Sequence, residues 1–334
     1  MADAATVEAA LKLLGTLGVS VEDLARLPVD RPAVPTFSEF LPRVRSATTA
    51  GTGKVYESYW RMMEERWGGR RLDEVTVTEI ASARNQVQAN ARVRRTTRGG
   101  TSAGEHFVAA ARRLFRFAVD DGLLSENPAL KVEKPRRQPS LRMAIGDARL
   151  AEIYDAAITH CHDPSLATLL IRFHTETACR RGGALALRPM DLDEDHLLVR
   201  LFEKGGRERW QPVSRTLMDH LLLHVEEREA GAGEPLFRSL RKRPITRKFY
   251  EVMWTAINAR VPWAARNNVS MHWIRHTTLT WVERRFGRSV ASAYAGHAQG
   301  PSHDGTISVY TKASLAEVAA ALAALVGEPH PLVS

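Results

Sequence analysis

The sequence predicts a mainly α-helical protein with two domains, the second of which contains a small β-hairpin. Apolar residues recur at helical spacing along most of the chain, whereas one stretch near residue 205 places β-forming residues on both sides of a glycine pair. At 334 residues, the chain is long enough for two domains that each bury a core. Hydrophobic residues make up 44% and charged residues 25%, which is the composition of a folded protein rather than a disordered or fibrous one.

The chain begins with a predicted helical arm and linker over residues 1–35. Apolar residues from Val7 to Leu14 share one helical face, Gly18 interrupts the pattern, and a second short helix is expected after Ser20. A stretch with several prolines then indicates a linker. Such an arm can bind a neighbouring subunit or a second DNA site. We expect the commoner arrangement, a helical cap on the next domain.

Residues 36–137 form the first predicted domain. Its pattern is helical, and its longest apolar stripe ends at Gly122. We expect the stripe to face the core of a small helical bundle. The stripe consists of Phe107, Ala110, Ala111, Leu114, Phe115 and Ala118.

Residues 138–334 form the second predicted domain, which is also mainly helical. Within it, the stretch 198–213 predicts a β-hairpin, because two adjacent glycines supply the positive φ that a tight turn requires. Ser314 and Glu317 have the spacing of a capping box, which marks the start of a C-terminal helix. Such a helix ordinarily covers the core of its own domain.

A net charge of +9 favours a polyanionic partner, since Lys and Arg side chains neutralise phosphates and release their counterions. Two basic segments of the first domain are the candidates for contact with DNA, although a solvated run of charge is the commoner explanation of such segments. One is a loop before two glycines, and the other is the interdomain linker. The predicted DNA-binding residues are Arg92, Arg94, Arg95 and Arg98 in the loop, and Lys131, Lys134, Arg136 and Arg137 in the linker.

Membrane and metal sites are not expected. No apolar run approaches the roughly 20 residues of a spanning helix, and no signal pattern is present at the N-terminus. The two cysteines, Cys161 and Cys179, are too few for a disulfide framework, which fits the cytoplasm. The stretch from His160 to Asp163 lacks a second ligand pair, so we interpret it as a polar helix end. We expect neither metal nor cofactor.

Six residues in a fixed order carry the strongest functional signal. His272 and Arg275 lie three apart, so a helix places them on one face, where they can hold an anion. The full set is Arg180, Lys204, His272, Arg275, His297 and Tyr310, and in this order it resembles the catalytic signature of the tyrosine recombinases, the phage-integrase family. The resemblance spans most of residues 36–326. Two departures are Gly183, where many members have an acidic residue, and a long segment between the last two residues of the set.

The resemblance implies a SAM-like, helical-bundle core-binding domain at residues 36–137 and an α-helical catalytic domain at 138–334. It implies a site-specific recombinase that acts as a homo-tetramer on paired sites in double-stranded DNA. In the family, the segment after the nucleophile often docks on a neighbouring protomer, so for the C-terminal helix this reading and the cover of its own core are close to equal. Tyr310 would attack the phosphodiester to form a 3′-phosphotyrosyl link. Arg180 and Arg275 would stabilise the transition state with paired hydrogen bonds. His272 and His297 would donate hydrogen bonds or manage the tyrosine proton, and Lys204 would protonate the departing 5′ oxygen.

Three alternatives stay open at this point. Tyr294, three residues before His297, is a rival nucleophile on a helical stretch. A relaxing enzyme similar to type IB topoisomerases would use the same catalytic set. A catalytically inactive DNA-binding accessory protein would have the same fold, and Gly183 and the long segment before Tyr310 are the features that favour it.

Overall fold

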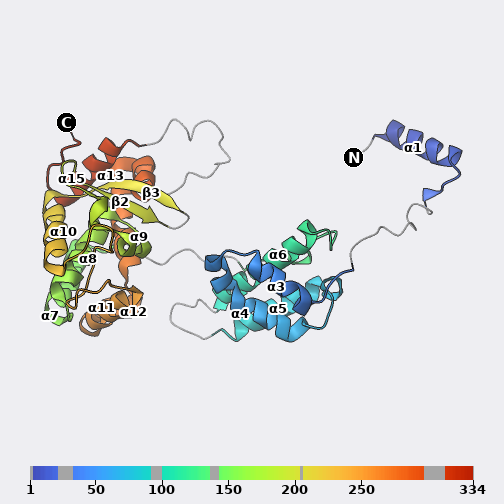
Figure 1. Ribbon diagram of the computed structural model, residues 1–334, viewed down its shortest axis with the longest axis horizontal. Helices are drawn as coiled ribbons and strands as arrows, with labels where there is room; N and C mark the ends of the chain where they lie inside the picture. Colours follow the sequence, from blue (N-terminus) through green and yellow to red (C-terminus); the bar gives the residue numbers. More distant parts are fainter. Residues whose placement is uncertain are drawn as a thin grey trace. The chain divides into compact units, whose positions relative to one another are not determined.

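The structure is a computed structural model, and it describes residues 3–21, 33–91, 100–135, 143–203, 206–296 and 313–333. The chain divides into two compact units, Met1–Pro139 and Ser140–Ser334. Figure 1 shows that both are built mainly of helices, with a small sheet in the second, which confirms the predicted fold class. The assignment of a core-binding role to residues 36–137 and a catalytic role to 138–334 stays a prediction. No helix in the described ranges has the length and apolar character needed to cross a membrane.

The N-terminal arm contains the helix α1 (Ala4–Thr16), whose first turn is capped by the Asp3 carboxylate. Its apolar residues Val7 and Leu11 are 46% and 52% exposed. The cap on the next domain that was expected of this arm stays a prediction. Most of the second predicted helix lies outside the described residues.

The first unit is a bundle around an aromatic core. Its helices are α3 (Phe37–Ser46), α4 (Ala50–Trp67), α5 (Val77–Ala89) and α6 (Thr101–Asp120), with short 3-10 turns at Leu72–Glu74 and Pro128–Leu130. All six residues of the predicted apolar stripe on α6 are buried, which confirms its orientation. The Phe37 ring meets that of Phe115 edge-on at 5.9 Å, and the buried Trp60 indole donates to the carbonyl of Ala110 at 3.2 Å.

The second unit surrounds a larger core with helices and one three-stranded antiparallel sheet. The helices are α7 (Asp147–His160), α8 (Pro164–Thr177), α9 (Arg181–Ala186), α10 (Arg215–Arg228), α11 (Arg247–Arg260), α12 (Pro262–Asn267), α13 (Met271–Tyr294) and α15 (Leu315–Val326), with a 3-10 turn at Pro189–Asp191. The strands are β1 (Leu192–Asp193), β2 (Leu198–Glu203) and β3 (Arg207–Pro212).

The predicted hairpin is confirmed. Strands β2 and β3 pair antiparallel, with Val199 opposite Gln211 and Glu203 opposite Arg207. Gly206 has a φ of 71°, the left-handed conformation that the glycine pair was expected to supply. The sequence did not predict β1, because two residues are too short to display alternation.

The helix α13 is two helical segments joined at Gly287. This residue has φ 83° and ψ 170°, a conformation that is open essentially only to glycine. His272 and Arg275 lie in the first segment, and Tyr294 ends the second.

The C-terminal helix α15 covers the core of its own unit. Val318 and Leu322 pack in one cluster with Val282 and Tyr294 of α13, which lies beside α15 in Figure 1. Of the two equal readings of this helix, the structure therefore supports the first. The predicted capping box between Ser314 and Glu317 is present. Beyond the helix, the Glu328 carboxylate accepts a hydrogen bond from Arg172 of α8 at 3.0 Å and another from the backbone N–H of Thr216 at 3.2 Å.

Candidate active site

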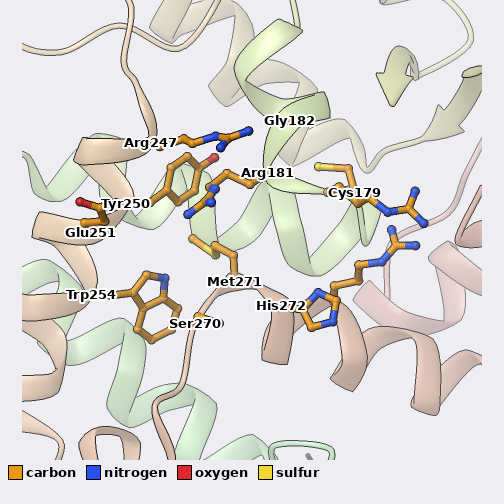
Figure 2. A pocket seen from close by; sticks show the side chains of 12 residues that line it. Cys179, Arg181, Gly182, Arg247, Tyr250, Glu251, Trp254, Ser270, Met271 and His272 are labelled. Carbon is orange, nitrogen blue, oxygen red and sulfur yellow. The ribbon is translucent and has the colours of Figure 1, made fainter. Parts of the chain in front are cut away.

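Three of the six predicted catalytic residues line one pocket in the second unit. Arg180 precedes α9, whereas His272 and Arg275 lie in the first turns of α13, so chain segments far apart in sequence meet here. The pocket has a volume of about 480 Å³. Figure 2 shows His272 and Cys179 on one side of it and the ring of Tyr250 on the other.

Arg275 fixes two parts of the pocket wall to each other. Its side chain is 4% exposed, and its guanidinium donates to the carbonyl of Ala178 and, at 2.8 Å, to the carbonyl of Ala295. The first carbonyl belongs to the turn before Arg180 and the second to the end of α13. A planar guanidinium suits this bridging because its N–H groups point in fixed directions.

Arg180 is half-buried and forms the N-terminal boundary of α9. Its carbonyl accepts the N–H of Gly183 at 2.8 Å, so the glycine that replaces the family's common acidic residue is part of the first turn after the arginine. Ala178, two residues earlier, is buried and has a φ of 47°. Arg180 therefore follows directly after a left-handed turn.

Two further arginines, which were not among the predicted site residues, line the same pocket. Arg181 is the neighbour of Arg180, and Arg247 begins α11 after a threonine cap. In Figure 2 their side chains lie beside Tyr250, on the opposite side from His272. The sequence signal available for Arg181 was its position next to Arg180. Nothing in the local sequence of Arg247 separates it from an ordinary exposed first-turn residue.

The other predicted site residues are placed as follows. Lys204, His297 and Tyr310 lie outside the described residues, as do Arg92, Arg94, Arg95, Arg98, Arg136 and Arg137. Lys131 is exposed and pairs with Glu126 at 2.7 Å. Lys134 lines a groove of about 860 Å³ on the first unit, together with three arginines of α6 that the sequence analysis did not select: Arg112, Arg113 and Arg116.

The structure makes the rival nucleophile Tyr294 unsuitable. Its side chain is 0% exposed, and its hydroxyl donates to the carbonyl of Glu176. Burial raises the pKa of Tyr294 far above its ordinary value, because the phenolate would lose its solvation. Burial likewise raises the pKa of Tyr250 well above its ordinary value and that of Tyr154 to about 12. Tyr56 and Tyr59 pack against the core of the first unit.

The His160–Asp163 stretch is a polar helix end, as predicted. His160 ends α7, and the Asp163 carboxylate caps α8 by accepting the N–H of Leu166 at 3.2 Å. The same carboxylate pairs with Arg228 at 3.2 Å. Among the side chains that the structure describes, no group of three or more His, Cys, Asp or Glu residues is placed to hold a metal ion.

The fold is that of DNA integrases of known structure. A lambda integrase tetramer bound to a Holliday junction superposes with a TM-score of 0.63 at 16% identity, over 91% of this chain and 90% of that one. The integrase of the transposon Tn1549, in complex with circular intermediate DNA, gives a TM-score of 0.62 at 15% identity, over 84% of this chain and 95% of that one. These similarities concern the fold.

The sequence itself is similar to tyrosine recombinases. Tyrosine recombinase XerD of Chlorobaculum tepidum is 25% identical over 183 residues, which cover 52% of this chain and 59% of XerD. Tyrosine recombinase XerC of Erythrobacter litoralis is 26% identical over 230 residues, or 67% of this chain and 72% of XerC. The chain thus spans little more than half the length of the XerD relative. No protein-family model matches it. The resemblance to the tyrosine recombinase, or phage integrase, family that the motif order predicted is confirmed.

Proposed function

We propose that the chain is a site-specific recombinase, which cuts and rejoins double-stranded DNA through a covalent 3′-phosphotyrosyl link to Tyr310. The observation that carries this proposal is that Arg180 meets His272 and Arg275 in one pocket, although nothing in the sequence separation between Arg180 and α13 requires it. The burial of Tyr294 removes the main rival for the nucleophile. The similarity to tyrosine recombinases supports the same conclusion.

The chemistry follows from the charge of the transition state. When a tyrosine oxygen attacks a phosphodiester, the five-coordinate phosphorus group carries more negative charge than the diester, and fixed positive donors must stabilise it. Arg180 would donate paired hydrogen bonds to the non-bridging oxygens, and Arg275, whose two terminal nitrogens also donate to backbone carbonyls, would add a further donor. His272 and His297 would add donors or manage the phenolic proton, because imidazoles titrate near neutrality. Lys204 would protonate the 5′ oxygen as it leaves. The phosphotyrosyl ester conserves the bond, so religation needs no ATP.

The proposed partner is double-stranded DNA, which this cytoplasmic protein would bind as a tetramer on paired sites. The first unit would hold the phosphate backbone through its basic loop, its linker and the groove on α6. That groove brings Arg113, Arg116 and Lys134 together, and positive charges so placed can contact phosphates. Arg112 lines it too, but its guanidinium donates to the carbonyls of Ala129, Leu130 and Val132. The lambda integrase tetramer on a Holliday junction is an assembly of the proposed kind.

A suicide-substrate assay tests this function. Duplexes are first selected from a random library for binding to the full chain, and are then nicked so that cleavage releases a short 5′-hydroxyl fragment. Because that fragment diffuses away, the wild type should accumulate a denaturant-resistant protein–DNA adduct without added metal or ATP.

Each alternative gives a different result in this assay. Tight binding to the selected duplexes with no adduct would contradict the proposal and favour the inactive accessory protein. Adduct formation combined with relaxation of a supercoiled plasmid that holds a single site, and with no exchange between two sites, would favour the topoisomerase-like enzyme.

A further inference from the structure

A buried histidine connects one wall of the pocket to the backbone of Arg180. His174, on α8, is 0% exposed. Its Nε2 atom lies 3.0 Å from the hydroxyl oxygen of Tyr250 on α11, and its Nδ1 atom lies 3.2 Å from the carbonyl oxygen of Cys179. That carbonyl belongs to the peptide bond whose nitrogen is the backbone nitrogen of Arg180. The histidine therefore links two elements of the pocket wall.

These partners determine which ring nitrogen carries the proton. Nδ1 of His174 lies near two atoms of Cys179, the carbonyl oxygen at 3.2 Å and the Sγ atom at 3.5 Å. Because a carbonyl oxygen has no hydrogen to donate and is the stronger acceptor, we infer that Nδ1 donates its N–H to it. Burial favours the neutral imidazole, in which Nε2 is then an acceptor, and the hydroxyl of Tyr250 donates to it. The hydrogen bonds thus run in one direction, from α11 through the imidazole to the peptide bond of Arg180.

The turn that this histidine restrains has an unusual backbone. Ala178 has φ 47° and ψ 23°, a left-handed conformation in which the alanine side chain is crowded. Such a conformation persists only where the surroundings hold it. Arg275 donates to the carbonyl of Ala178, and the N–H of Cys179 donates to the hydroxyl of Thr177 at 3.2 Å. The bond from His174 restrains the next carbonyl along the chain.

We propose that His174 and Tyr250 are positioning residues for Arg180 in DNA cleavage, an inference that rests on the proposed recombinase function. Both side chains are too buried to hold a phosphate, with exposures of 0% and 1%. They act through the peptide bond between Cys179 and Arg180. The orientation of this bond sets the direction in which the Arg180 side chain leaves the backbone. A misplacement of about 1 Å in such a group can cost on the order of 100-fold in rate.

The protonation state gives a test that does not depend on catalysis. In the full chain labelled with ¹⁵N-histidine, the two ring nitrogens of His174 are assigned by comparison with the His174→Asn variant. The expected result is a proton on Nδ1 and none on Nε2, with the Nε2 resonance shifted in the Tyr250→Phe variant. A proton on Nε2, or no response to Tyr250→Phe, would overturn the inferred chain of hydrogen bonds.

Cleavage rates then separate positioning from mere stability. On a nicked suicide duplex, His174→Leu should lower the single-turnover rate by roughly 10- to 100-fold with little change in DNA affinity. His174→Asn should recover much of this loss, because its amide N–H lies near the place of Nδ1–H. Tyr250→Phe should have a smaller effect, since His174 keeps its bond to Cys179.

The matched control is His224→Leu. His224 is also buried in the second unit and accepts a backbone hydrogen bond, from the N–H of Arg238 at 3.2 Å, but it does not line the pocket. This variant should lose stability while its folded fraction cleaves at the wild-type rate. If His174→Leu does not fold, Tyr250→Phe decides the question, because a cleavage rate no lower than that of the His224→Leu control would then overturn the proposal.

A double-mutant cycle tests whether His174 acts through Arg180. In an Arg180→Lys background, His174→Leu should cause little further loss, because the group that it positions is already gone. If the two substitutions lowered the cleavage rate independently, so that their fold-losses multiplied, the proposal would be overturned. A His174→Leu variant that cleaves at the wild-type rate, on a duplex with which the wild type forms the adduct, would also overturn it. Absence of adduct from a DNA-bound wild type is a different failure, because it contradicts the recombinase function itself.

Discussion

The cores of the two units differ in chemistry. In the first unit, the buried polar side chains among the described residues are those of Thr48 and Asn127. The described part of the second unit buries many more polar groups, several of them charged: Asp163, His174, Glu176, Thr177, Asp191, Gln211, Ser214, His224, Arg228, Arg275, Thr278 and His330. Burial of such groups costs free energy unless each is hydrogen-bonded, so a core built for stability alone would contain few of them.

This difference indicates how each unit works. The first unit is an apolar scaffold whose charges lie on its surface, as in the pair of Arg45 with Glu57 and Glu64, and its proposed role is to present those charges to DNA. The second unit holds polar groups in its interior, and two of them, His174 and Arg275, contact the turn before Arg180. The predictions below test this division, from the largest expected effect to the smallest.

Arg180→Lys should lower the rate of adduct formation by roughly 10²- to 10³-fold while DNA affinity changes little. The substitution keeps the charge but removes the planar pair of donors, so the loss falls on the transition state. Single-turnover cleavage and equilibrium binding measure the two effects separately. Arg241→Lys, an exposed substitution in the same unit, is the control. Weakened binding with retained cleavage would make Arg180 an ordinary backbone contact.

His224 should make the second unit less stable in acid. Burial, assisted by the charge of Arg228, lowers the folded-state pKa of His224 to about 4 from the ordinary 6.5. As the pH falls from 6.5 to about 4, His224 takes up a proton in the unfolded chain but not in the folded one. The free energy of unfolding therefore decreases over this pH range. The loss should approach roughly 3 kcal/mol, at about 1.4 kcal/mol per pKa unit.

The control for this prediction is His224→Gln, which keeps an acceptor for the N–H of Arg238 but cannot gain a charge. Urea unfolding of both proteins from pH 7 to pH 4 gives the comparison. The wild type should lose stability relative to the variant as the pH falls. Parallel profiles would mean that this buried imidazole does not resist protonation.

Gly287→Ala should destabilise the second unit by about 1–3 kcal/mol, because a side chain is strained at φ 83° and ψ 170° even though a Cβ would meet no atom within 4 Å. Gly233→Ala is matched to it, since a Cβ there also has open space and the φ of Gly233 is not left-handed. Thermal unfolding should show a fall for the first variant and little change for the second. Equal melting temperatures would contradict the glycine-only backbone conformation at residue 287.

The smallest effects are expected on the surface of the first unit. Lys134→Ala should reduce the magnitude of the log–log salt slope of DNA binding by about 0.9, the value for one phosphate contact on B-form DNA. Lys131→Ala should reduce it less, because Lys131 already pairs with Glu126 and must leave that carboxylate to bind DNA. Binding titrations at several salt concentrations measure both slopes. If both slopes stayed unchanged, Lys131 and Lys134 would not contact phosphates, and their segment would be a solvated run of charge.

Elements with a strong local pattern were predictable from the sequence. The stripe on α6, the β2–β3 hairpin and the capping box of α15 follow from periodicity, turn glycines and cap spacing, all of which are local. The meeting of Arg180 with His272 and Arg275 was predictable only from the order of the motif, since no local rule joins distant segments.

Features that depend on tertiary packing were not predictable. Tyr294 stayed a rival to the preferred Tyr310, because helical spacing does not say which face of a short segment another element covers. His174 gave no signal, because its two hydrogen-bond partners come from α11 and from the turn after α8.

The central claim is that Tyr310 becomes covalently attached to DNA, and mapping the attachment tests it most directly. The wild-type adduct on a nicked suicide duplex is digested with protease, and the peptide that remains on the DNA is sequenced. The expected peptide contains Tyr310. Tyr310→Phe should form no adduct while it still binds the duplex. Tyr294→Phe should form the adduct, with the DNA attached to Tyr310. Attachment at Tyr294, or an adduct that persists in Tyr310→Phe, would contradict the account.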